Sequence, residues 1–396
     1  MERQNVIVVH NRYQRPGGED QVVGAEVALL RSFGHETELF SLDNSAIAHM
    51  GLLRLTRATF WNDDVYGTLR ALFRRHAPLV AHFHNTFPLV SPAAYYAARD
   101  EGVPVVQTLH NFRLVCPNGL LFRDGHACEE CVGRSLAWPG IAHGCYRGSR
   151  STTAVTAAMV AWHRARGTWA SAVDMYIALS QFSRGRFTEG GLPKDRIAVK
   201  PNFLVRDPGV GDHAGGYGLF VGRLSHEKGL DILLDAWAQL AMPYPLRVVG
   251  SGPLEGRMQD CGPGIEWLGQ QPTERVMALM KDASFLVLPS ECYENFPVTI
   301  VEAFATGLPV IASRTGSLAE IVRDRETGLH FRSGDASDCA ATIGWAVQHA
   351  PEMRTYGQSA RLEFEQKFGP QQNYSQLRAI YGLAAEHAAA AARSPA

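Results

Sequence analysis

The stretch ECYENFPVTIVEA, residues 291–303, places Glu294 and Glu302 eight residues apart across the junction between a loop and a helix. The apolar run SFLVLPS (284–290) predicts a buried strand before the loop, and Pro297 suits the first turn of the helix after it. Glu294 is then in the loop and Glu302 about a turn and a half inside the helix. The two carboxylates therefore cannot share one surface stripe, and we expect them to hold two parts of one extended ligand.

The start of this helix is also a predicted anion site. Backbone amides around Asn295, Phe296 and Val298 fall at the positive end of the helix, which favours a phosphate. A ligand that carries a sugar, a phosphate and a ribose would match the amides and the carboxylates together. The alternative is that Glu294 and Glu302 are ordinary solvated acids, and the neighbouring sequence decides between the two interpretations.

A second strand, loop and helix pattern occurs in GLFVGRLSHEKGLDILLDAW (218–237), where Arg223 and Lys228 bracket the loop. Arginine offers a planar fork of donors and lysine a compact point charge, so the two can neutralise oxygens on both phosphates of a diphosphate. The alternative is a pair of solvated surface cations.

These motifs resemble the C-terminal half of glycosyltransferase family 4, the retaining transferases with the GT-B fold, and among them the bacterial hexosyltransferases of polysaccharide synthesis. The motifs occur in the family's order, which is G-R-L-x-x-E-K-G, G-S-G-P, E-x7-E, then G-x-P-V-I-A-S. The likeness is close over residues 216–340 and looser in the N-terminal half. The resemblance implies an α/β chain with GT-B architecture, two doubly wound Rossmann-like domains facing a central cleft.

Length and composition agree with two domains. The chain has 396 residues, 46% of them hydrophobic, which exceeds what one hydrophobic core usually spans. Strand-like runs alternate with helical patterns, as in parallel sheets with crossover helices. We expect an acceptor-side domain at residues 1–204, a Gly- and Pro-rich linker at 205–217 and a nucleotide-sugar domain at 218–372. A C-terminal helix and tail at 373–396 would pack back on the first domain.

Net charge and hydropathy limit the classes of partner that the protein is expected to bind. A formal net charge of -1 argues against nucleic acid, so anion binding must come from local clusters. The start MERQNVIVVH reads as a first strand and not as a signal peptide, and no apolar run approaches the roughly 18 to 20 residues of a membrane span. We expect a cytoplasmic protein, with any membrane contact peripheral and at the inner face of the cell membrane.

Three N-terminal loops could supply the other wall of the cleft. In RPGGED (15–20), Gly17 and Gly18 would let a ligand approach backbone amides, and the family has a glycine loop beside the donor diphosphate here. The alternative is an ordinary tight turn. In HFHNTFPLVSP (82–92), three residues could shape the acceptor side or belong to the core: His82, His84 and Asn85.

The third loop is HNFRLVCPNG (110–119), which begins at the end of a predicted strand. A histidine at a strand end is often a satisfied core group. His110, however, stands where the family has a histidine that approaches the donor sugar, so the resemblance implies a role for it.

Four of the seven cysteines fall in one segment, Cys116, Cys128, Cys131 and Cys145. The inner Cys-x2-Cys pair has the spacing of zinc ligands, with His126 and His143 close by, and a reducing cytoplasm disfavours disulfides. A structural zinc site is one interpretation, and ordinary buried thiols are the other. Four cysteines would close the metal to water, which argues against a catalytic zinc.

Two other function classes are an NAD-dependent oxidoreductase and a non-catalytic binding protein. GSGPLEG (250–256) superficially matches a dinucleotide fingerprint, but its spacing is G-x-G-x-x-x-G, so an NAD-dependent oxidoreductase is a poor interpretation. A non-catalytic nucleotide-sugar-binding protein is not excluded by any motif, because every motif residue is a binding residue.

The resemblance implies the following roles. Arg223 and Lys228 hold the leaving diphosphate, and Glu302 accepts hydrogen bonds from the ribose. Glu294 does the same for the donor sugar, with His110 beside it. The remaining donor-binding positions are Gly17, Gly18, Gly222, Gly252, Asn295, Phe296 and Pro297.

Same-face attack needs no carboxylate nucleophile, and we expect no catalytic metal, because Asn62-Asp63-Asp64 resembles a helix cap and not a metal motif. Two departures from the family could alter donor choice: Asn295 replaces a common glycine, and PNFLV (201–205) replaces Pro-Asn-Gly-hydrophobic-Asp. The donor is a nucleoside diphosphate sugar, and the acceptor a glycan or polyprenyl-linked saccharide.

Three segments combine arginine with apolar residues: LLRLTRATFW (52–61), RALFRRHAP (70–78) and HRARGTW (163–169). They could form a basic amphipathic face that rests on anionic lipid. The alternative is that they pack as core with a solvated basic rim.

Overall fold

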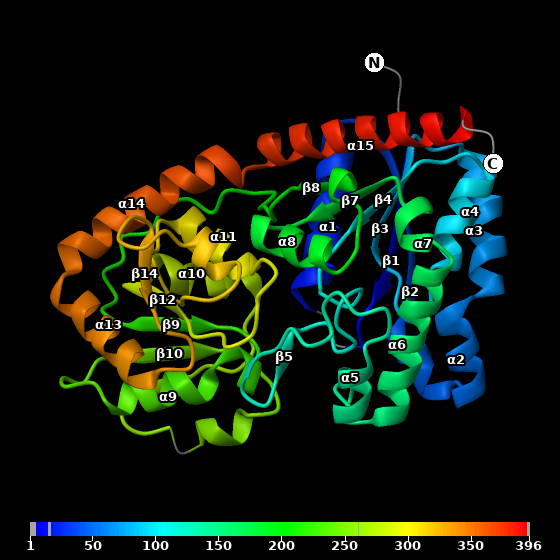
Figure 1. The fold of residues 1–396 in the computed structure, drawn as a ribbon. Helices are drawn as coiled ribbons and strands as arrows, with labels where there is room; N and C mark the ends of the chain where they lie inside the picture. The colour runs from blue at the N-terminus through cyan, green and yellow to red at the C-terminus, as the bar shows by residue number, and fades with distance from the viewer. Residues whose placement is uncertain (1–4, 15–16, 260, 394–396) are drawn as a thin grey trace. The chain divides into compact units, whose positions relative to one another are not determined.

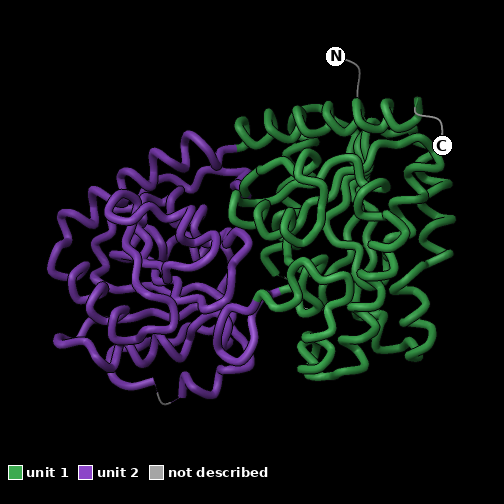
Figure 2. The backbone as a smooth tube through the Cα atoms, in the orientation of Figure 1, with its two compact units in different colours: residues 1–119, 129–201, 370–396 green, residues 120–128, 202–369 purple. Residues whose placement is uncertain are grey.

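The computed structural model describes residues 5–14, 17–259 and 261–393. Arg15 and Pro16 of the predicted glycine loop lie outside the described residues. The chain divides into two compact units, shown in Figure 2. Unit 1 comprises residues 1–119, 129–201 and 370–396, and unit 2 comprises residues 120–128 and 202–369.

Unit 1 is built on a parallel six-stranded sheet in the order β2-β1-β3-β4-β7-β8 (Figure 1). The central strands are buried along their whole length, as expected for a sheet covered on both faces. The strands are β1 (Asn5–Arg12), β2 (Glu36–Asp43), β3 (Val80–Asn85), β4 (Val105–Thr108), β7 (Met175–Ala178) and β8 (Ile197–Val199).

The helices of unit 1 include one from the far end of the sequence. Helix α15 (Pro370–Arg393) contacts α1, β3, β4 and β7 of this unit. The others are α1 (Gly18–Ser32), α2 (Leu52–Phe60), α3 (Asp63–His76), α4 (Ala93–Asp100), α5 (Trp138–His143), α6 (Arg150–Ala165), α7 (Thr168–Ser171) and α8 (Gln181–Glu189), with short 3-10 helices η1 (Asn44–His49) and η2 (Lys194–Arg196).

Unit 2 has a second parallel six-stranded sheet, in the order β11-β10-β9-β12-β13-β14. Its strands are β9 (Gly218–Val221), β10 (Leu246–Val249), β11 (Ile265–Trp267), β12 (Phe285–Leu288), β13 (Val310–Ser313) and β14 (Gly328–Phe331). Its helices are α9 (Leu230–Ala238), α10 (Thr273–Asp282), α11 (Val298–Thr306), α12 (Leu318–Ile321), α13 (Ala336–Gln348) and α14 (Ala350–Lys367), with η3 (His226–Lys228) and η4 (Glu255–Met258). A small hairpin pairs β5 (Phe122–Arg123) with β6 (His126–Ala127).

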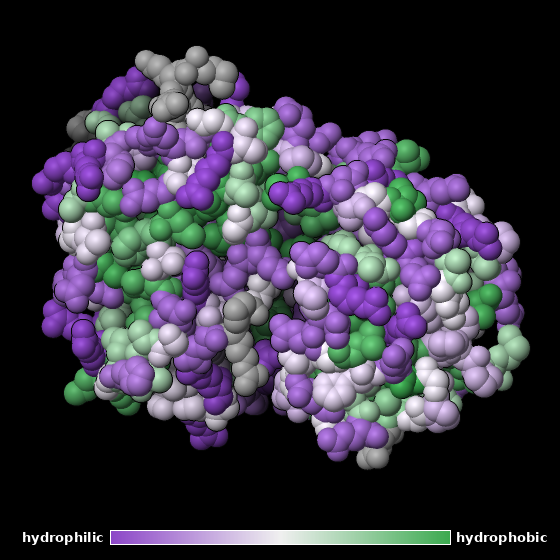
Figure 3. All heavy atoms as spheres, turned by 180° about the vertical axis from the view of Figure 1, so that it is seen from behind, coloured by the Kyte–Doolittle hydropathy of each residue, from purple (hydrophilic) through white to green (hydrophobic). Residues whose placement is uncertain are grey.

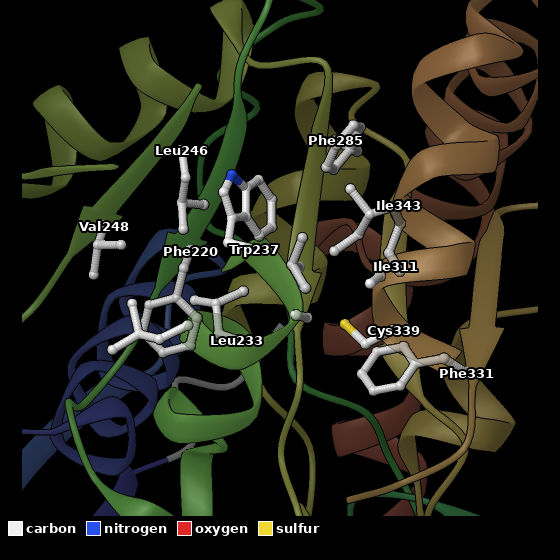
Figure 4. Packing of buried hydrophobic residues seen from close by; sticks show 14 of the residues in the cluster. Phe220, Leu233, Trp237, Leu246, Val248, Phe285, Ile311, Phe331, Cys339 and Ile343 are labelled. Atoms are coloured by element: carbon white, nitrogen blue, oxygen red, sulfur yellow. The ribbon is translucent and has the colours of Figure 1, made fainter. Parts of the chain in front are cut away.

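The core of unit 2 joins side chains from both kinds of element. Figure 4 shows Trp237 of α9 near Phe285 of β12, and Cys339 and Ile343 of α13 near Ile311 of β13. The indole of Trp237 donates to the backbone oxygen of Tyr244 at 2.8 Å, so its polar atom is satisfied at the edge of the core. This packing holds the strand ends in place, and the candidate site lies at those ends.

The fold class expected from the resemblance is confirmed: each unit is a Rossmann-like parallel sheet with crossover helices. Every predicted strand is present, and Asn62 caps α3 by accepting a hydrogen bond from the Val65 amide, as expected for a helix cap. Two features were missed, strand β2 and the hairpin of β5 and β6. Strand β2 has the sequence ETELFSLD, which lacks an apolar run because the strand is half-exposed at the sheet edge.

The segments of the predicted basic face belong to unit 1, and much of their charge is paired. Arg70 and Arg74 of α3 both bind Glu101 at 2.8 Å, and His163 is buried, so these groups form a rim around packed helices. At the exposed start of α2, apolar and basic groups do occur together, because Leu52 and Leu53 are 68% and 87% exposed there.

Hydrophilic and hydrophobic residues alternate over both units on the face drawn in Figure 3. Within the described residues, no helix is both long and apolar enough to cross a bilayer.

Candidate functional site

The predicted donor residues of unit 2 gather at one point of its sheet. The chain passes from β9 outward through β10 to β11, and then returns to β12 on the other side of β9. Such a reversal leaves a crevice at the carboxyl ends of the two neighbouring strands, where parallel sheets bind ligands. The loops that follow β9 and β12 carry Arg223, Lys228 and Glu294.

The two loops meet through a short ion pair. The Nζ atom of Lys228 lies 2.6 Å from Oε1 of Glu294, and the Ser290 hydroxyl donates to the same oxygen at 2.7 Å. Burial would lower the pKa of Lys228, but the Glu294 carboxylate outweighs it and holds that pKa above its usual value. A lysine in this setting stays charged, so it can meet an anionic phosphate.

Backbone contacts fix the loops in this position. The amides of Glu291 and Cys292 donate to the carbonyl oxygen of Glu227 at 3.1 and 3.3 Å. Gly229 has φ +70°, and a Cβ atom there would lie 1.9 Å from the carbonyl oxygen of Pro289. Only glycine permits this approach of the two loops, so the last residue of G-R-L-x-x-E-K-G has a packing reason.

Gly222 and Gly252, predicted to bind the donor, use their amides within the protein. The Gly222 amide donates to Val249 at 3.0 Å, and the Gly252 amide donates to Oε1 of Glu255 at 2.7 Å. A Cβ atom on Gly252 would lie 2.3 Å from the Leu224 carbonyl oxygen. These glycines therefore shape the loops after β9 and β10, and their amides are already bonded.

Glu302 and Arg223 differ from Lys228 and Glu294, because they have no ion-pair partner among the residues that the structure describes. Glu302 is half-buried on α11, and burial raises its pKa from 4.5 to about 7. A half-buried carboxylate costs stability unless something bonds to it, so this position suits a ligand that donates hydrogen bonds.

The start of α11 carries the other predicted donor positions. Pro297 is the N-cap residue, and the helix begins one residue later than the proline suggested. The Phe296 ring is buried beside Phe368, with ring centroids 5.8 Å apart, and its carbonyl oxygen accepts from Asn202 at 2.9 Å. Phe296 thus anchors the loop, and Asn295 beside it is also buried.

Unit 1 has the same kind of reversal, between β1 and β3. His10, near the end of β1, is 2.9 Å from Asp20, and the hydroxyl of Tyr13, just after β1, donates to Glu19 at 2.9 Å. Burial raises the pKa of Glu19 from 4.5 to about 8. Sequence reasoning missed this group, although Glu19 follows Gly18 directly.

Gly17 and Gly18, which introduce this group, are exposed. A Cβ atom at either residue would meet nothing within 4 Å, so packing does not require glycine there. The Gly17 amide donates to the Asp20 carboxylate at 2.9 Å, which caps α1.

Strand β3 contributes a buried polar cluster around Glu26 of α1. Oε1 of Glu26 lies 2.8 Å from Nδ1 of His82 and 3.3 Å from Nε2 of His84, and its other oxygen binds Lys200 at 3.0 Å. Glu26, His82 and His84 together could hold a metal ion. The Lys200 ammonium already neutralises the carboxylate, however, so the geometry is that of a buried hydrogen-bonded ion pair.

The predicted acceptor-side residues separate into two groups. His82 is in the core, because Tyr381 lies 2.9 Å from Nδ1 and Thr108 lies 2.8 Å from Nε2. Asn85 donates to the Asn11 carbonyl oxygen at 2.8 Å and so shapes the turn after β3, although it also lines the cavity described next.

His84 and His110 are joined and line one cavity. Nδ1 of His84 is 2.8 Å from Nε2 of His110, and both residues line a cavity with Asn111 and Arg113 at the carboxyl ends of β3 and β4. Burial lowers the pKa of His84 to about 4 and lowers the pKa of His110 well below its usual value. Both rings are therefore neutral at pH 7, and His110 can bond a hydroxyl without carrying charge.

Comparison with known proteins identifies the family. The family description Glycosyltransferase Family 4 matches residues 16–206, and the description Glycosyl transferases group 1 matches residues 214–363. The chain belongs to glycosyltransferase family 4. The match to group 1 spans the loops of Lys228 and Glu294, and the match to family 4 spans the histidine cluster.

Curated relatives resemble part of the chain. An uncharacterized glycosyltransferase of Methanocaldococcus jannaschii is 30% identical over 213 residues, which are 52% of this chain and 59% of the relative. The putative colanic acid biosynthesis glycosyltransferase WcaL of Escherichia coli is 27% identical over 222 residues, which are 50% of this chain and 54% of the relative. The chain thus spans about half the length of the curated relatives it matches.

Solved structures of the same fold cover nearly the whole chain. Anabaena HepE, in complex with UDP and glucose, has a TM-score of 0.67 at 16% identity and covers 95% of this chain and 99% of its own. Sucrose-phosphate synthase from Thermosynechococcus elongatus has a TM-score of 0.70 at 18% identity, covering 96% and 98%. At these identities the likenesses show the shared fold alone.

Proposed function

We propose that the chain is a retaining glycosyltransferase that moves a hexosyl group from a nucleoside diphosphate sugar to a glycan or lipid-linked saccharide. The observation that carries the proposal is the contact between Lys228 and Glu294 at the reversal of the unit 2 sheet, with Glu302 beyond it on α11. Lys228 would bind the phosphate of such a sugar donor, Glu294 its sugar and Glu302 its ribose.

Lys228 and Arg223 act on the diphosphate. As the bond from the sugar to the phosphate breaks, negative charge builds on the leaving oxygen, and fixed cations at that place stabilise the transition state more than the ground state. The Glu294 carboxylate, oriented by Ser290 and Lys228, accepts hydrogen bonds from hydroxyls of the sugar. Glu302 accepts from the ribose hydroxyls when it is ionised.

Unit 1 supplies the acceptor side in this proposal. His110 presents a neutral ring in the cavity and can bond a sugar hydroxyl, while His84 fixes the ring from behind. Attack on the same face as the leaving group, with the leaving phosphate taking the acceptor's proton, keeps the anomeric configuration without a carboxylate nucleophile.

The relatives narrow the donor and the acceptor. HepE was crystallised with UDP and glucose, which favours a uridine diphosphate hexose as the first donor to test. WcaL carries the description of a colanic acid biosynthesis enzyme, which favours a growing polysaccharide or its lipid-linked precursor as the acceptor. We place the reaction in the cytoplasm at the inner face of the membrane, where α2 would touch lipid.

The decisive experiment incubates purified protein with a panel of nucleotide sugars and follows donor consumption and product configuration by NMR. Product with the donor's anomeric configuration supports the proposal, and product with the inverted configuration contradicts the retaining mechanism. A non-catalytic binding protein would show a thermal shift with one donor and no consumption with any saccharide acceptor. An oxidoreductase would instead consume NAD, which the spacing G-x-G-x-x-x-G at 250–256 argues against.

A further inference from the structure

His110, in the cavity of unit 1, has one ring nitrogen bonded within the protein. Its Nε2 atom is 2.8 Å from Nδ1 of His84. The ring centroids are 5.1 Å apart, and the ring planes are inclined by only 19°. For nitrogens 2.8 Å apart, so large a centroid separation means that the rings meet edge to edge. An imidazole donates and accepts hydrogen bonds in this direction, so one proton lies between the two nitrogens.

Two arrangements of protons satisfy this bond. Both rings are neutral at pH 7, because burial lowers the pKa of His84 to about 4 and the pKa of His110 well below its usual value. Each neutral imidazole carries one proton. Either Nδ1 of His84 donates, and Nδ1 of His110 carries the other proton, or Nε2 of His110 donates, and Nδ1 of His110 has none. His110 therefore offers a ligand a hydrogen-bond donor in the first arrangement and an acceptor in the second.

Glu26 lies on the other side of His84. Its Oε1 atom is 3.3 Å from Nε2 of His84 and 2.8 Å from Nδ1 of His82, and all three side chains are fully buried. Although burial raises the pKa of Glu26, Lys200 and His82 hold it well below its usual value, so the carboxylate is ionised. An ionised carboxylate accepts hydrogen bonds and has no proton to donate. Lys200 binds the other oxygen at 3.0 Å, which leaves Oε1 to the histidines.

The charge of Glu26 decides between the two arrangements. Nε2 of His84 is buried and, apart from this contact, has no hydrogen-bond partner among the described residues. Without a proton, Nε2 would direct a lone pair at the carboxylate, and such repulsion is strong in a low-dielectric interior. The proton of His84 is therefore on Nε2, and its Nδ1 accepts from Nε2 of His110. Nδ1 of His110 is then left without a proton.

We propose that Glu26, acting through His84, fixes the tautomer of His110 so that its Nδ1 atom accepts a hydrogen bond from a sugar hydroxyl. Glu26 is a positioning residue, because His84 and His110 line the cavity and Glu26 is buried behind them. No hydrogen bond from a residue that the structure describes reaches Nδ1 of His110, which leaves this atom to a ligand. The inference rests on the proposed function in taking that ligand to be a sugar. A nitrogen that only accepts selects a hydroxyl and disfavours a carboxylate at this position.

NMR of the ligand-free full chain, with nitrogen-15 in its histidines, tests the tautomer directly. Correlations between the ring nitrogens and the carbon-bound ring protons distinguish a protonated nitrogen from a bare one. The signals of His110 are assigned by their loss in His110→Asn. We expect a proton on Nε2 of His110 and none on Nδ1 at pH 7. A proton on Nδ1, or a mixture of the two tautomers, would overturn the proposal.

Variants show whether Glu26 is responsible. Glu26→Leu combined with Lys200→Met removes the carboxylate together with the ammonium that neutralises it, so His110 should populate both tautomers. The matched control is Glu101→Gln, which removes another ion-paired carboxylate of unit 1, bound to Arg70 at 2.8 Å, and should leave the His110 signals unchanged. An unchanged tautomer in the double variant would overturn the role of Glu26. If the double variant fails to fold, the spectrum of the unaltered chain can still overturn the proposal.

Steady-state kinetics separate this inference from the proposed function. With the nucleotide sugar that the donor panel identifies, kcat/KM should fall about tenfold in the double variant, the size of one hydrogen bond, and stay unchanged in Glu101→Gln. An unchanged kcat/KM in a double variant whose tautomer has changed would overturn the contact with the sugar. A chain that turns over no nucleotide sugar, yet shows the expected tautomer, would contradict the proposed function and support the assignment of the proton.

Discussion

Lys228 and Glu294, which stand 66 residues apart in the chain, are joined by a 2.6 Å contact from Nζ to Oε1. The same carboxylate oxygen accepts from the Ser290 hydroxyl at 2.7 Å. The proposed phosphate-binding lysine and sugar-binding carboxylate are therefore already joined before a ligand binds. Each orients the other, which reduces the ordering that a ligand must impose on binding.

The first prediction follows from this contact. Lys228→Ala and Glu294→Ala should each lower turnover by about a hundredfold or more, the loss of roughly a few kcal/mol of transition-state stabilisation. Because the two groups act together, the double variant should be much less impaired than the product of the single effects. Steady-state rates and circular dichroism of the three proteins provide the measurement.

A matched control is Lys367→Ala, which removes another ion-paired lysine of unit 2, bound to Glu363 at 2.8 Å. That variant should keep its rate. Near-normal turnover in Lys228→Ala or Glu294→Ala would show that the assigned site is wrong.

The second prediction concerns Glu302 and pH. Burial raises its pKa to about 7, and ribose hydroxyls bond the ionised form, so donor binding should strengthen as pH rises from 6 to 8. Binding below pH 7 should release a proton, which calorimetry in buffers of different ionisation enthalpy detects. Glu302→Gln should abolish both effects, and a proton release that persists in this variant would assign it to another group.

The same carboxylate affects stability in the opposite direction. A raised pKa means that the ionised form of Glu302 is disfavoured in the folded state, so the contribution of Glu302 to stability is greatest below pH 4.5 and is lost as pH rises through about 7. Glu302→Gln should therefore raise the melting temperature at pH 8 and change it less at pH 5. We therefore expect Glu302→Gln to be more stable than the unaltered protein and to bind the sugar donor less tightly.

The third prediction tests the buried pair of Glu26 and Lys200. Glu26→Ala leaves the Lys200 ammonium, 2% exposed, without its carboxylate, which should destabilise unit 1 by about 3 to 5 kcal/mol. Glu26→Leu combined with Lys200→Met should recover most of that loss. Hydrogen exchange in β3 peptides measures the change within unit 1, and unchanged protection in Glu26→Ala would contradict the assignment.

The pH dependence of this pair has a definite sign. Lys200 and His82 outweigh burial and hold the pKa of Glu26 well below 4.5, so its contribution is present above pH 4.5 and is lost as pH falls further. The acid limb of the stability curve of unit 1 should flatten in the apolar double variant.

The fourth prediction concerns lipid. The exposed start of α2 combines Leu52 and Leu53 with Arg54, so anionic vesicles should bind the protein at low salt and release it at high salt. Replacing Leu52 and Leu53 by serine should weaken flotation with the vesicles.

Its control is Arg74→Glu, because Arg74 already binds Glu101 and should contribute little. Failure to float under any salt condition would favour an acceptor that is not in a membrane.

Most of the fold could be predicted because buried parallel strands appear in the sequence as short apolar runs. GLFV and FLVL, the runs of β9 and β12, are examples. Strand β2 could not be found this way, because an edge strand exposes one side and needs no such run. The loops with Lys228 and Glu294 were found through their motif, although spacing alone gives no distance between them.

The buried cluster of unit 1 shows where sequence reasoning ends. Glu26 falls on the inner face of α1, where a charge signals a buried partner, but the partner Lys200 is 174 residues away. Tyr381, which closes the cluster, comes from α15. No local pattern names a partner across such a separation, since only the folded sheet brings the three residues together.

Helix α15 has a consequence for how the protein is made. A nascent chain leaves the ribosome with its N-terminus first, yet the cluster of Glu26 and Lys200 needs Asn373 and Tyr381, which are synthesised after all of unit 2. Unit 2, whose residues are complete by Gly369, can finish folding during translation. Unit 1 therefore keeps a lysine and a carboxylate in an unfinished core until α15 has left the ribosome.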